Sequence, residues 1–448
     1  MRPAPAFTLI GLLILVTRLC HWNVVWVEEA YPLAAAMEML RGKLPYRDFW
    51  FDKPPLFPAF YAIFGAQTGV TLRIAGSLFI LLCCWLAYRL AGRLWGGREG
   101  LIAASLLAFF LTFDFAPAVM ALAPDLLMVA PHLAAILFAV EGRPYGAGAM
   151  CGLALLVNPK AVFVAAACLI WQWRSAHKVA LGTAAVAAPA AILFGWNQWQ
   201  QVYEWGFLYS RQALSATPWK DGLLRTASWA WFHAALIAAA AFALRRDLGL
   251  WAAISLAGAL TGMRFFPRYY FQFLPAMTIL AAGGMPRMGR RWWLAAALLI
   301  VPLARFGPRY PMVAAGEPWA DLALHDDARQ AALLLRRHNA ASLLVWGYRP
   351  EIFAYSRVPA ATRFLDSQPL TGVLADRHLV STTAAAPEIA RRNRQELIRT
   401  TPQFIADGLG PLNPALAITQ YPDLAAWLAP YREVGRTPWT ILYRRETP

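Results

Sequence analysis

Long apolar stretches with few charges occupy most of the first 306 residues, and they constrain the fold more than any other feature. About eleven of them are long enough, or nearly so, to cross the hydrocarbon core of a bilayer as helices. They run over residues 5–25, 70–92, 99–117, 123–141, 145–158, 160–173, 179–196, 226–244, 248–264, 269–285 and 291–306. Hydrophobic residues make up 59% of the chain and charged residues only 15%, so one water-soluble core could not bury these stretches. The sequence therefore predicts a polytopic α-helical membrane protein.

The basic residues indicate how the chain is oriented. They cluster in every second connection, at Arg89, Arg93 and Arg98, then Arg143, then Arg174 and Lys178, then Arg245 and Arg246, then Arg287, Arg290 and Arg291. Cytoplasmic loops carry such an excess of Lys and Arg, so we expect a multi-pass protein of the cytoplasmic (inner) membrane with its N-terminus inside. An odd number of spans then places everything after about residue 307 outside. These loops also account for the net charge of +16, which predicts contact with membrane lipids and no nucleic-acid partner.

The composition changes after residue 306. Charged residues become common in 307–448, and the apolar runs shorten to strand length. Apolar residues at 324, 328, 331 and 335 have helical spacing, while 342–346, 402–406 and 439–443 have the pattern of buried strands. We expect a membrane domain over 1–306 and a small extracytoplasmic α/β domain over 307–448.

One predicted outer loop, residues 22–69, is too rich in charge to be a plain connector. It contains Glu28, Glu29, Tyr31, Glu38, Arg41, Lys43, Arg47, Asp48, Asp52 and Lys53. The apolar segments 34–40 and 57–64 within it are predicted to be helices lying on the bilayer surface. Carboxylates at the mouth of a helix bundle favour a functional site. The alternative is that Glu28 and Glu29 only complement the dipole at a helix start.

Four motifs occur in order within this loop. They are Glu28-Glu29-Ala30-Tyr31, Met39-Leu40-Arg41-Gly42, Pro45-Tyr46-Arg47-Asp48-Phe49-Trp50 and Lys53-Pro54-Pro55-Leu56. Together they resemble the first outer loop of the protein O-mannosyltransferase and aminoarabinose transferase families of polyprenyl-phosphate-dependent glycosyltransferases. Weaker similarities follow at Pro124-Asp125-Leu126-Leu127, Asn158-Pro159-Lys160 and Arg268-Tyr269-Tyr270.

The resemblance implies a membrane glycosyltransferase of the C superfold that takes a sugar from a polyprenyl-phosphate donor. The acceptor would be a hydroxyl of a lipid, a glycan or a protein. Such a donor leaves as a stabilised phosphate anion, so the reaction needs mainly one base to take the acceptor proton, and direct displacement inverts the anomeric carbon. By position, Glu28 matches the family's catalytic Asp and Glu29 the acidic residue after it. Glu in place of Asp is a departure from the family pattern.

The resemblance also implies residues that bind the donor. Lys53, Arg268, Tyr269 and, more loosely, Arg211 match phosphate-contacting positions, although basic side chains can also reach lipid headgroups from a span. Further candidates for substrate contact are Tyr31, Tyr46, Asp48, Asp52, Asp125, Lys160 and Tyr270. We expect no cofactor. A divalent ion between Glu28 and Asp125 is conceivable, but a monophosphate donor does not require one.

Two other classes of function remain open. Charges among spans also line the pathways of transporters and lipid flippases. A non-catalytic, lipid-binding relative of the transferases would keep the cations and could lose the base. Finally, Gly148 and Gly152 form a Gly-x-x-x-Gly pattern, which predicts close packing of two spans.

Overall fold

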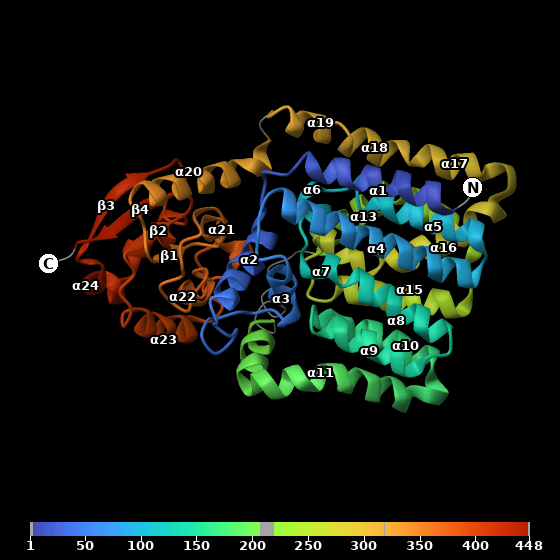
Figure 1. Ribbon diagram of the computed structural model, residues 1–448, viewed down its shortest axis with the longest axis horizontal. Coiled ribbons are helices and arrows are strands. Elements are labelled where there is room, and N and C mark those ends of the chain that lie inside the picture. The colour runs from blue at the N-terminus through green and yellow to red at the C-terminus, as the bar shows by residue number, and fades with distance from the viewer. Residues whose placement is uncertain (1–2, 207–218, 318, 447–448) are drawn as a thin grey trace.

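The computed structural model describes residues 3–206, 219–317 and 319–446, and it divides into a helical bundle and a domain built on a β-sheet (Figure 1). The bundle helices run roughly alongside one another in Figure 1. They are α1 Pro3–Leu19, α4 Val70–Leu94, α5 Gly97–Phe110, α8 Val129–Val140, α9 Pro144–Leu155, α10 Val162–Trp171, α11 Ala176–Trp199, α15 Arg246–Leu260, α16 Leu274–Gly284, α17 Trp292–Leu298 and α18 Ile300–Phe306.

All eleven apolar stretches contain helix, but few are single long helices. Of the described helices, two are long and apolar enough to cross a membrane, over Val70–Leu94 and Trp173–Glu204. A third span results if α13 Trp219–Phe232 and the following Ala234–Ala243 count as one, although they meet at an angle of 76°. Elsewhere short helices follow one another, as where α17 ends and α18 begins on either side of Leu299. A hydropathy profile averages over the breaks between such short helices, and it therefore predicted longer spans.

The charged loop 22–69 lies between the bundle and the sheet domain (Figure 1). It folds into α2 Val27–Leu40 and α3 Leu56–Ile63. The prediction that 34–40 lies on the bilayer surface is wrong for most of the segment, because every α2 residue from Glu29 to Glu38 is buried within the protein. Helix α2 instead packs against α3 and against α21 Glu351–Ser356 of the sheet domain.

The last part of the chain forms a four-stranded mixed sheet with helices around it. The strands are β1 Leu343–Trp346, β2 Phe404–Asp407, β3 Tyr431–Arg436 and β4 Ile441–Arg445, in the order β1-β2-β4-β3. Strands β1 and β2 are parallel, and the other pairs are antiparallel. The helices include α20 Ala323–Arg337, α22 Gln368–Thr371, α23 Pro387–Leu397 and α24 Ala425–Leu428. Strands β1, β2 and β4 coincide with the three strands expected from the sequence, while β3 has too many exposed positions to be recognised by hydrophobicity.

The sheet domain is held to the outer loop by hydrogen bonds whose donors come from both parts. The Trp50 amide donates to the Arg363 carbonyl at 2.7 Å, and the Arg357 guanidinium donates to the Ala66 carbonyl at 2.6 Å. The buried Glu38 carboxylate accepts from the Ala360 amide at 3.2 Å. This docking places the sheet domain over the end of the bundle.

Candidate active site

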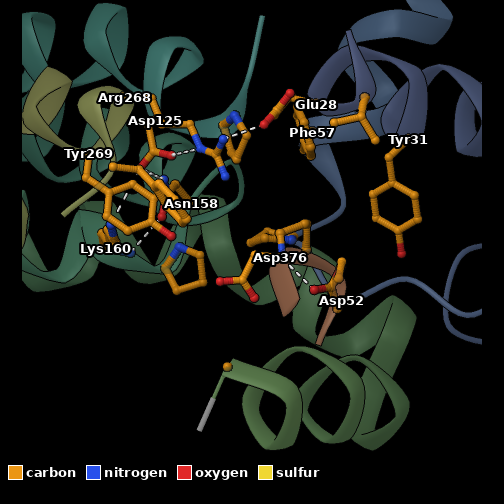
Figure 2. A pocket seen from close by; sticks show the side chains of 18 of the residues that line it. Glu28, Tyr31, Asp52, Phe57, Asp125, Asn158, Lys160, Arg268, Tyr269 and Asp376 are labelled. Carbon is orange, nitrogen blue, oxygen red and sulfur yellow. Dashed lines mark hydrogen bonds and ion pairs between the residues drawn. The ribbon is translucent and has the colours of Figure 1, made fainter. Parts of the chain in front are cut away.

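A cavity of about 1320 Å³ lies where the bundle, the outer loop and the sheet domain meet. Figure 2 shows its polar part, in which charged side chains from separate segments of the chain lie close together, among them Glu28, Asp125 and Arg268. The cavity is lined by three predicted cations, Lys53, Lys160 and Arg268, and by three predicted carboxylates, Glu28, Asp52 and Asp125. Residues far apart in the sequence therefore share one site.

Glu28 faces Arg268 across the cavity (Figure 2). It lies in the first turn of α2, where a carboxylate is stabilised by the helix dipole. Its Oε1 is 2.5 Å from Nη1 of Arg268, and Arg268 Nε is 3.8 Å from Oδ2 of Asp125. Arg268 lies in the short helix η5 Pro267–Gln272, which directly precedes α16. One guanidinium thus bridges two carboxylates from different parts of the chain.

Asp125 is positioned by its neighbours. It begins α7 Pro124–Leu127 and accepts a hydrogen bond from Nδ2 of Asn158 at 3.1 Å. Nζ of Lys160, in η1 Pro159–Ala161, is 3.7 Å from Asp125 Oδ1 and 3.1 Å from the ring centre of Tyr269. The cation is held between a carboxylate and an aromatic face, both of which favour its charged form.

Lys53 and Asp52 form the other side of the polar part. Nζ of Lys53 is 2.5 Å from Oδ2 of Asp52, which is 6% exposed. The Tyr46 hydroxyl donates to the Lys53 carbonyl at 2.6 Å. Tyr46 therefore fixes the backbone of Lys53 and does not line the cavity itself. Tyr31 does line the cavity, and its ring stacks on Phe51 at 4.8 Å.

Glu29 does not reach the cavity, contrary to its expected place beside the reacting groups. It is fully buried, and its carboxylate forms two hydrogen bonds with Arg73 at 3.0 and 2.6 Å. The Leu122 amide donates to the same carboxylate at 3.2 Å. Arg18 and Arg73 both donate to the Met120 carbonyl, so Arg18 is buried rather than directed to the membrane interface. Glu29, Arg73 and Arg18 together hold segment 119–122 in place by hydrogen bonds.

Two more of the predicted contacts lie elsewhere, and a third falls outside the described residues. Asp48 pairs with its exposed neighbour Arg47 at 2.7 Å, and it does not line the cavity. The Tyr270 hydroxyl is 2.6 Å from the Thr226 hydroxyl, and its ring stacks on Trp229, away from the cavity. Arg211 belongs to residues 207–218, which the structure does not describe.

Another part of the cavity lining is apolar and comes from α10 and α11. It consists of Val162, Phe163, Ala184, Ala187, Ala188 and Ala191. Only 11% of the apolar window in the span containing α11 is buried within the protein, so most of this helix is exposed on the outside of the bundle. One cavity therefore has both a charged and an apolar lining.

The sheet domain contributes lining residues that were not predicted. They are Tyr348, Arg349, Glu351, Asp376 and His378, together with Arg264 from the segment before η5. No motif marks them; the available signal was that polar residues directly follow the buried strand at 342–346. Among the described residues, no group of three or more His, Cys, Asp or Glu side chains is arranged to hold a metal ion.

Comparison with known proteins agrees with the architecture. Residues 52–196 match the family model of dolichyl-phosphate-mannose-protein mannosyltransferase. No curated protein sequence matches the chain. The fold is similar to that of ArnT from Cupriavidus metallidurans bound to undecaprenyl phosphate, with a TM-score of 0.61, 15% identity, and coverage of 98% of this chain and 97% of that one.

Two further structures share the fold. The oligosaccharyltransferase of Archaeoglobus fulgidus has a TM-score of 0.52 and 14% identity, and the match covers 95% of this chain and 71% of that one. The arabinofuranosyltransferase AftD from Mycobacteria has a TM-score of 0.51 and 15% identity, and it covers 99% of this chain and 40% of that one. At these identities the likeness establishes the fold.

Proposed function

Because the chain has the fold of the polyprenyl-phosphate-dependent glycosyltransferases of the C superfold, as its outer-loop motifs indicated, we propose that it transfers a sugar from a polyprenyl-phosphate donor to an acceptor hydroxyl. One observation carries the proposal: Glu28, three cations and apolar side chains of α10 and α11 line a single cavity. A lipid with an anionic head needs this combination. A transporter pathway would not require a carboxylate placed beside the phosphate-binding cations.

The donor would bind with its phosphate among Arg268, Lys53 and Lys160. Arg can hold two phosphate oxygens at once, and Lys adds a point charge. The isoprenoid tail would lie along the apolar lining from α10 and α11, which includes four small Ala side chains. The positive-inside distribution of Lys and Arg supports a position of this end of the bundle at the outer face of the cytoplasmic membrane.

Glu28 is the proposed base. The acceptor oxygen attacks the anomeric carbon as its proton passes to the Glu28 carboxylate. The bond between that carbon and the phosphate oxygen breaks, and its electron pair leaves with the phosphate. Attack opposite the leaving group inverts the configuration. A positioned base contributes about 10² to 10⁴ in rate, and no protonation of the phosphate is needed.

Arg268 links base and donor. Oε1 of Glu28 lies 2.5 Å from Nη1 of Arg268, the same group that the donor phosphate would contact. Phosphate binding would therefore release Glu28 from its ion pair and make its carboxylate available to the acceptor. The longer Glu arm, unusual for the family, suits a carboxylate that changes partner. Asp125, held by Asn158, keeps Arg268 in place during the exchange.

Two substitutions test this function in purified, detergent-solubilised protein. We expect Glu28→Gln to reduce transfer from polyprenyl-phosphate sugars by at least about 10²-fold, because the amide cannot accept the proton. It should bind undecaprenyl phosphate at least as tightly as the unaltered protein, because a competitor for Arg268 is lost. Lys53→Ala should weaken that binding. Transfer is measured as the release of polyprenyl phosphate. Binding is measured by titration with undecaprenyl phosphate.

Glu99→Gln is the matched control, since Glu99 also lies in the first turn of a bundle helix but does not line the cavity. Undiminished transfer by Glu28→Gln would refute the assignment of the base. Binding of undecaprenyl phosphate without transfer of any sugar by the unaltered protein would instead identify a non-catalytic relative.

A further inference from the structure

The helix that carries Glu28 begins without a side-chain cap. Trp26 occupies the N-cap position of α2, and its carbonyl accepts hydrogen bonds from the amides of Glu29 at 2.9 Å and Ala30 at 2.8 Å. The preferred N-cap residues Ser, Thr, Asp and Asn also accept a hydrogen bond from an amide of the first turn through their side chains. An indole has only a donor and cannot do so. The position of this helix start therefore depends on what holds Trp26.

Trp26 is buried and is held by a carboxylate from the later part of the chain. It is 6% exposed, and its indole Nε1–H donates to Oδ2 of Asp321 at 3.5 Å. A buried Trp N–H usually finds a hydrogen-bond partner. The distance is long for a hydrogen bond, but the charge of the carboxylate strengthens the attraction. The indole ring also lies 5.6 Å from the guanidinium carbon of Arg73.

Asp321 is itself fixed in orientation. It lies in the short helix η7 Ala320–Leu322, directly before α20 of the sheet domain. Arg309, the first residue of α19 Arg309–Ala314, donates to both carboxylate oxygens of Asp321 at 3.0 Å each. Such a two-point contact between Arg and a carboxylate adds geometric specificity to the attraction. The Asp321 carboxylate is thus presented to Trp26 in one orientation.

Arg309 is held in place by aromatic neighbours. It is 8% exposed, and its guanidinium carbon lies 5.0 Å from the centre of the Trp319 ring. Its Nε donates to Nε2 of His21 at 3.2 Å. The His21 ring also lies 5.5 Å from the ring of Trp26. The residues that fix Asp321 and the residue that it holds therefore form one cluster.

The sheet domain contacts the chain on both sides of Glu28. Before it, the hydroxyl of Tyr355 in α21 donates to the Asn23 carbonyl at 3.3 Å. After it, the ring of Tyr348 lies 5.7 Å from that of Tyr31. Tyr31 follows Glu28 by three residues, so the two lie on the same face of α2. The position of the sheet domain thus determines the position of the helix turn that carries the proposed base.

The proposed reaction is sensitive to the position of that turn. Displacement of a reacting group by about 1 Å can cost about 10²-fold in rate. A Glu side chain has more rotatable bonds than the Asp of the family pattern, so a fixed helix start limits where the Glu28 carboxylate can lie. Loosening the start of α2 would widen that range and lower the fraction of molecules in which the base meets the acceptor.

We propose that Asp321 is a positioning residue for Glu28. Through the contact with Trp26, the sheet domain fixes the start of α2, and Arg309 keeps the Asp321 carboxylate in the required orientation. This inference rests on the proposed transfer reaction and adds a role for the sheet domain in it. Asp321 lines the cavity, but it acts through Trp26 and not on the substrate.

Trp26→Phe tests the contact, because it keeps an aromatic ring and removes the indole N–H. In the full-length, detergent-solubilised protein we expect faster hydrogen exchange in peptides covering 27–31, since the first turn of α2 opens more often. The rate constant for transfer from a polyprenyl-phosphate sugar should fall about tenfold or more. Undecaprenyl phosphate should still bind at least as tightly. Trp427→Phe, which loses an indole hydrogen bond to the Thr400 carbonyl at 2.8 Å and does not line the cavity, is the matched control and should change none of these.

Arg309→Lys tests how the effect arises, since Arg309 does not line the cavity. Lysine keeps the charge but cannot bind both oxygens of Asp321 as a planar fork, so we expect a smaller decrease in transfer. If Arg309 acts through Trp26, Arg309→Lys will cause little further decrease when Trp26→Phe is already present. Arg436→Lys, which loses a two-point contact with Glu433 in the sheet domain, is the control for this change.

Unchanged exchange over 27–31 in Trp26→Phe would overturn the inference. Losses of transfer that multiply in the double variant would overturn it as well, because the two residues would then act independently. A loss of transfer matched by an equal loss of undecaprenyl phosphate binding would assign the cluster to folding and not to the base. Absence of transfer by the unaltered protein would count against the transfer function, while the exchange measurement would still test the contact between Asp321 and Trp26.

Discussion

Adjacent residues at the start of α2 have opposite environments. Successive helix residues point about 100° apart, so Glu28 faces the cavity while Glu29 faces the interior. The acidic pair was recognisable in the sequence, and so was its likeness to a transferase loop. Which carboxylate is buried depends on Arg73, 44 residues away, and on the Leu122 amide. No local pattern contains that information, so the sequence left both as candidates.

Asp366 provides a pH-dependent prediction at the residue scale. Burial, together with the nearby Asp52 carboxylate, raises the pKa of Asp366 to about 8, against about 3.9 in an unfolded chain. Between these values the folded state holds the extra proton, so this group's contribution to stability falls as pH rises. Asp366→Asn keeps the acceptor for the Gln368 amide and cannot ionise. Its stability relative to the unaltered protein should therefore increase from about pH 5 to about pH 9.

Thermal unfolding midpoints across that pH range measure the effect. Glu388→Gln serves as the control, because Glu388 is an exposed carboxylate on α23 with a side chain 77% exposed. A constant difference between Asp366→Asn and the unaltered protein at all pH values would show that Asp366 ionises normally.

At the scale of elements, the contact between α9 and α11 confirms the predicted close packing at Gly148 and Gly152. A Cβ on Gly148 would lie 2.1 Å from the Val179 carbonyl oxygen, and one on Gly152 would lie 2.7 Å from that of Thr183. The Thr183 hydroxyl also donates to the Gly148 carbonyl at 3.1 Å. Small residues allow this approach in membrane bundles, where apolar burial alone does not drive helices together.

Gly148→Leu should separate these helices. The larger side chain meets backbone atoms that cannot move aside, which costs at least about 1–3 kcal/mol. We expect lower yield of folded protein and a lower unfolding midpoint in detergent. Gly92→Leu in α4 is the matched control, since a Cβ there meets nothing within 4 Å. If the yield and the unfolding midpoint fell equally in both variants, the cause would be the leucine side chain itself and not the contact between the helices.

Hydropathy predicted where the bundle helices are, and it failed where helices are interrupted or enclosed. Segment 34–40 was expected at the bilayer surface because of its apolar residues, but the sheet domain and α3 cover it. The signal for burial in protein and the signal for burial in lipid are the same at the level of sequence. Only the position of the later domain distinguishes them.

At the scale of the whole molecule, Glu38 couples the outer loop to the sheet domain. Its buried carboxylate binds Arg41 and Lys43 at 2.5 Å each and accepts from the Ala360 amide. Glu38→Ala leaves that amide without its acceptor, and it leaves Arg41 and Lys43 with only the backbone carbonyls of Arg357 and Ala360 as acceptors. Hydrogen exchange at Ala360 and its neighbours should accelerate about tenfold, as for the loss of one hydrogen bond. Asp48→Ala removes a partly exposed carboxylate of the same loop and should leave that exchange unchanged; acceleration in both variants would contradict the coupling.

The distribution of the cavity over three parts of the chain limited prediction of the site. Glu28, Lys53, Asp125, Lys160 and Arg268 were recognisable because each belongs to a motif in the first 306 residues. Arg349, Glu351 and His378 follow elements of the sheet domain that carry no motif. They reach the cavity only because the whole domain is docked over it.

The grouping of three cations near Glu28 affects the end of the proposed catalytic cycle. A polyprenyl-phosphate sugar is a diester with one negative charge, whereas the carrier that remains after transfer is a monoester with about −1.5 to −2 at neutral pH. Lys53, Lys160 and Arg268 would therefore bind the sugar-free carrier more tightly than the sugar-linked donor. Repeated turnover would then depend on how quickly the surrounding membrane removes the sugar-free carrier.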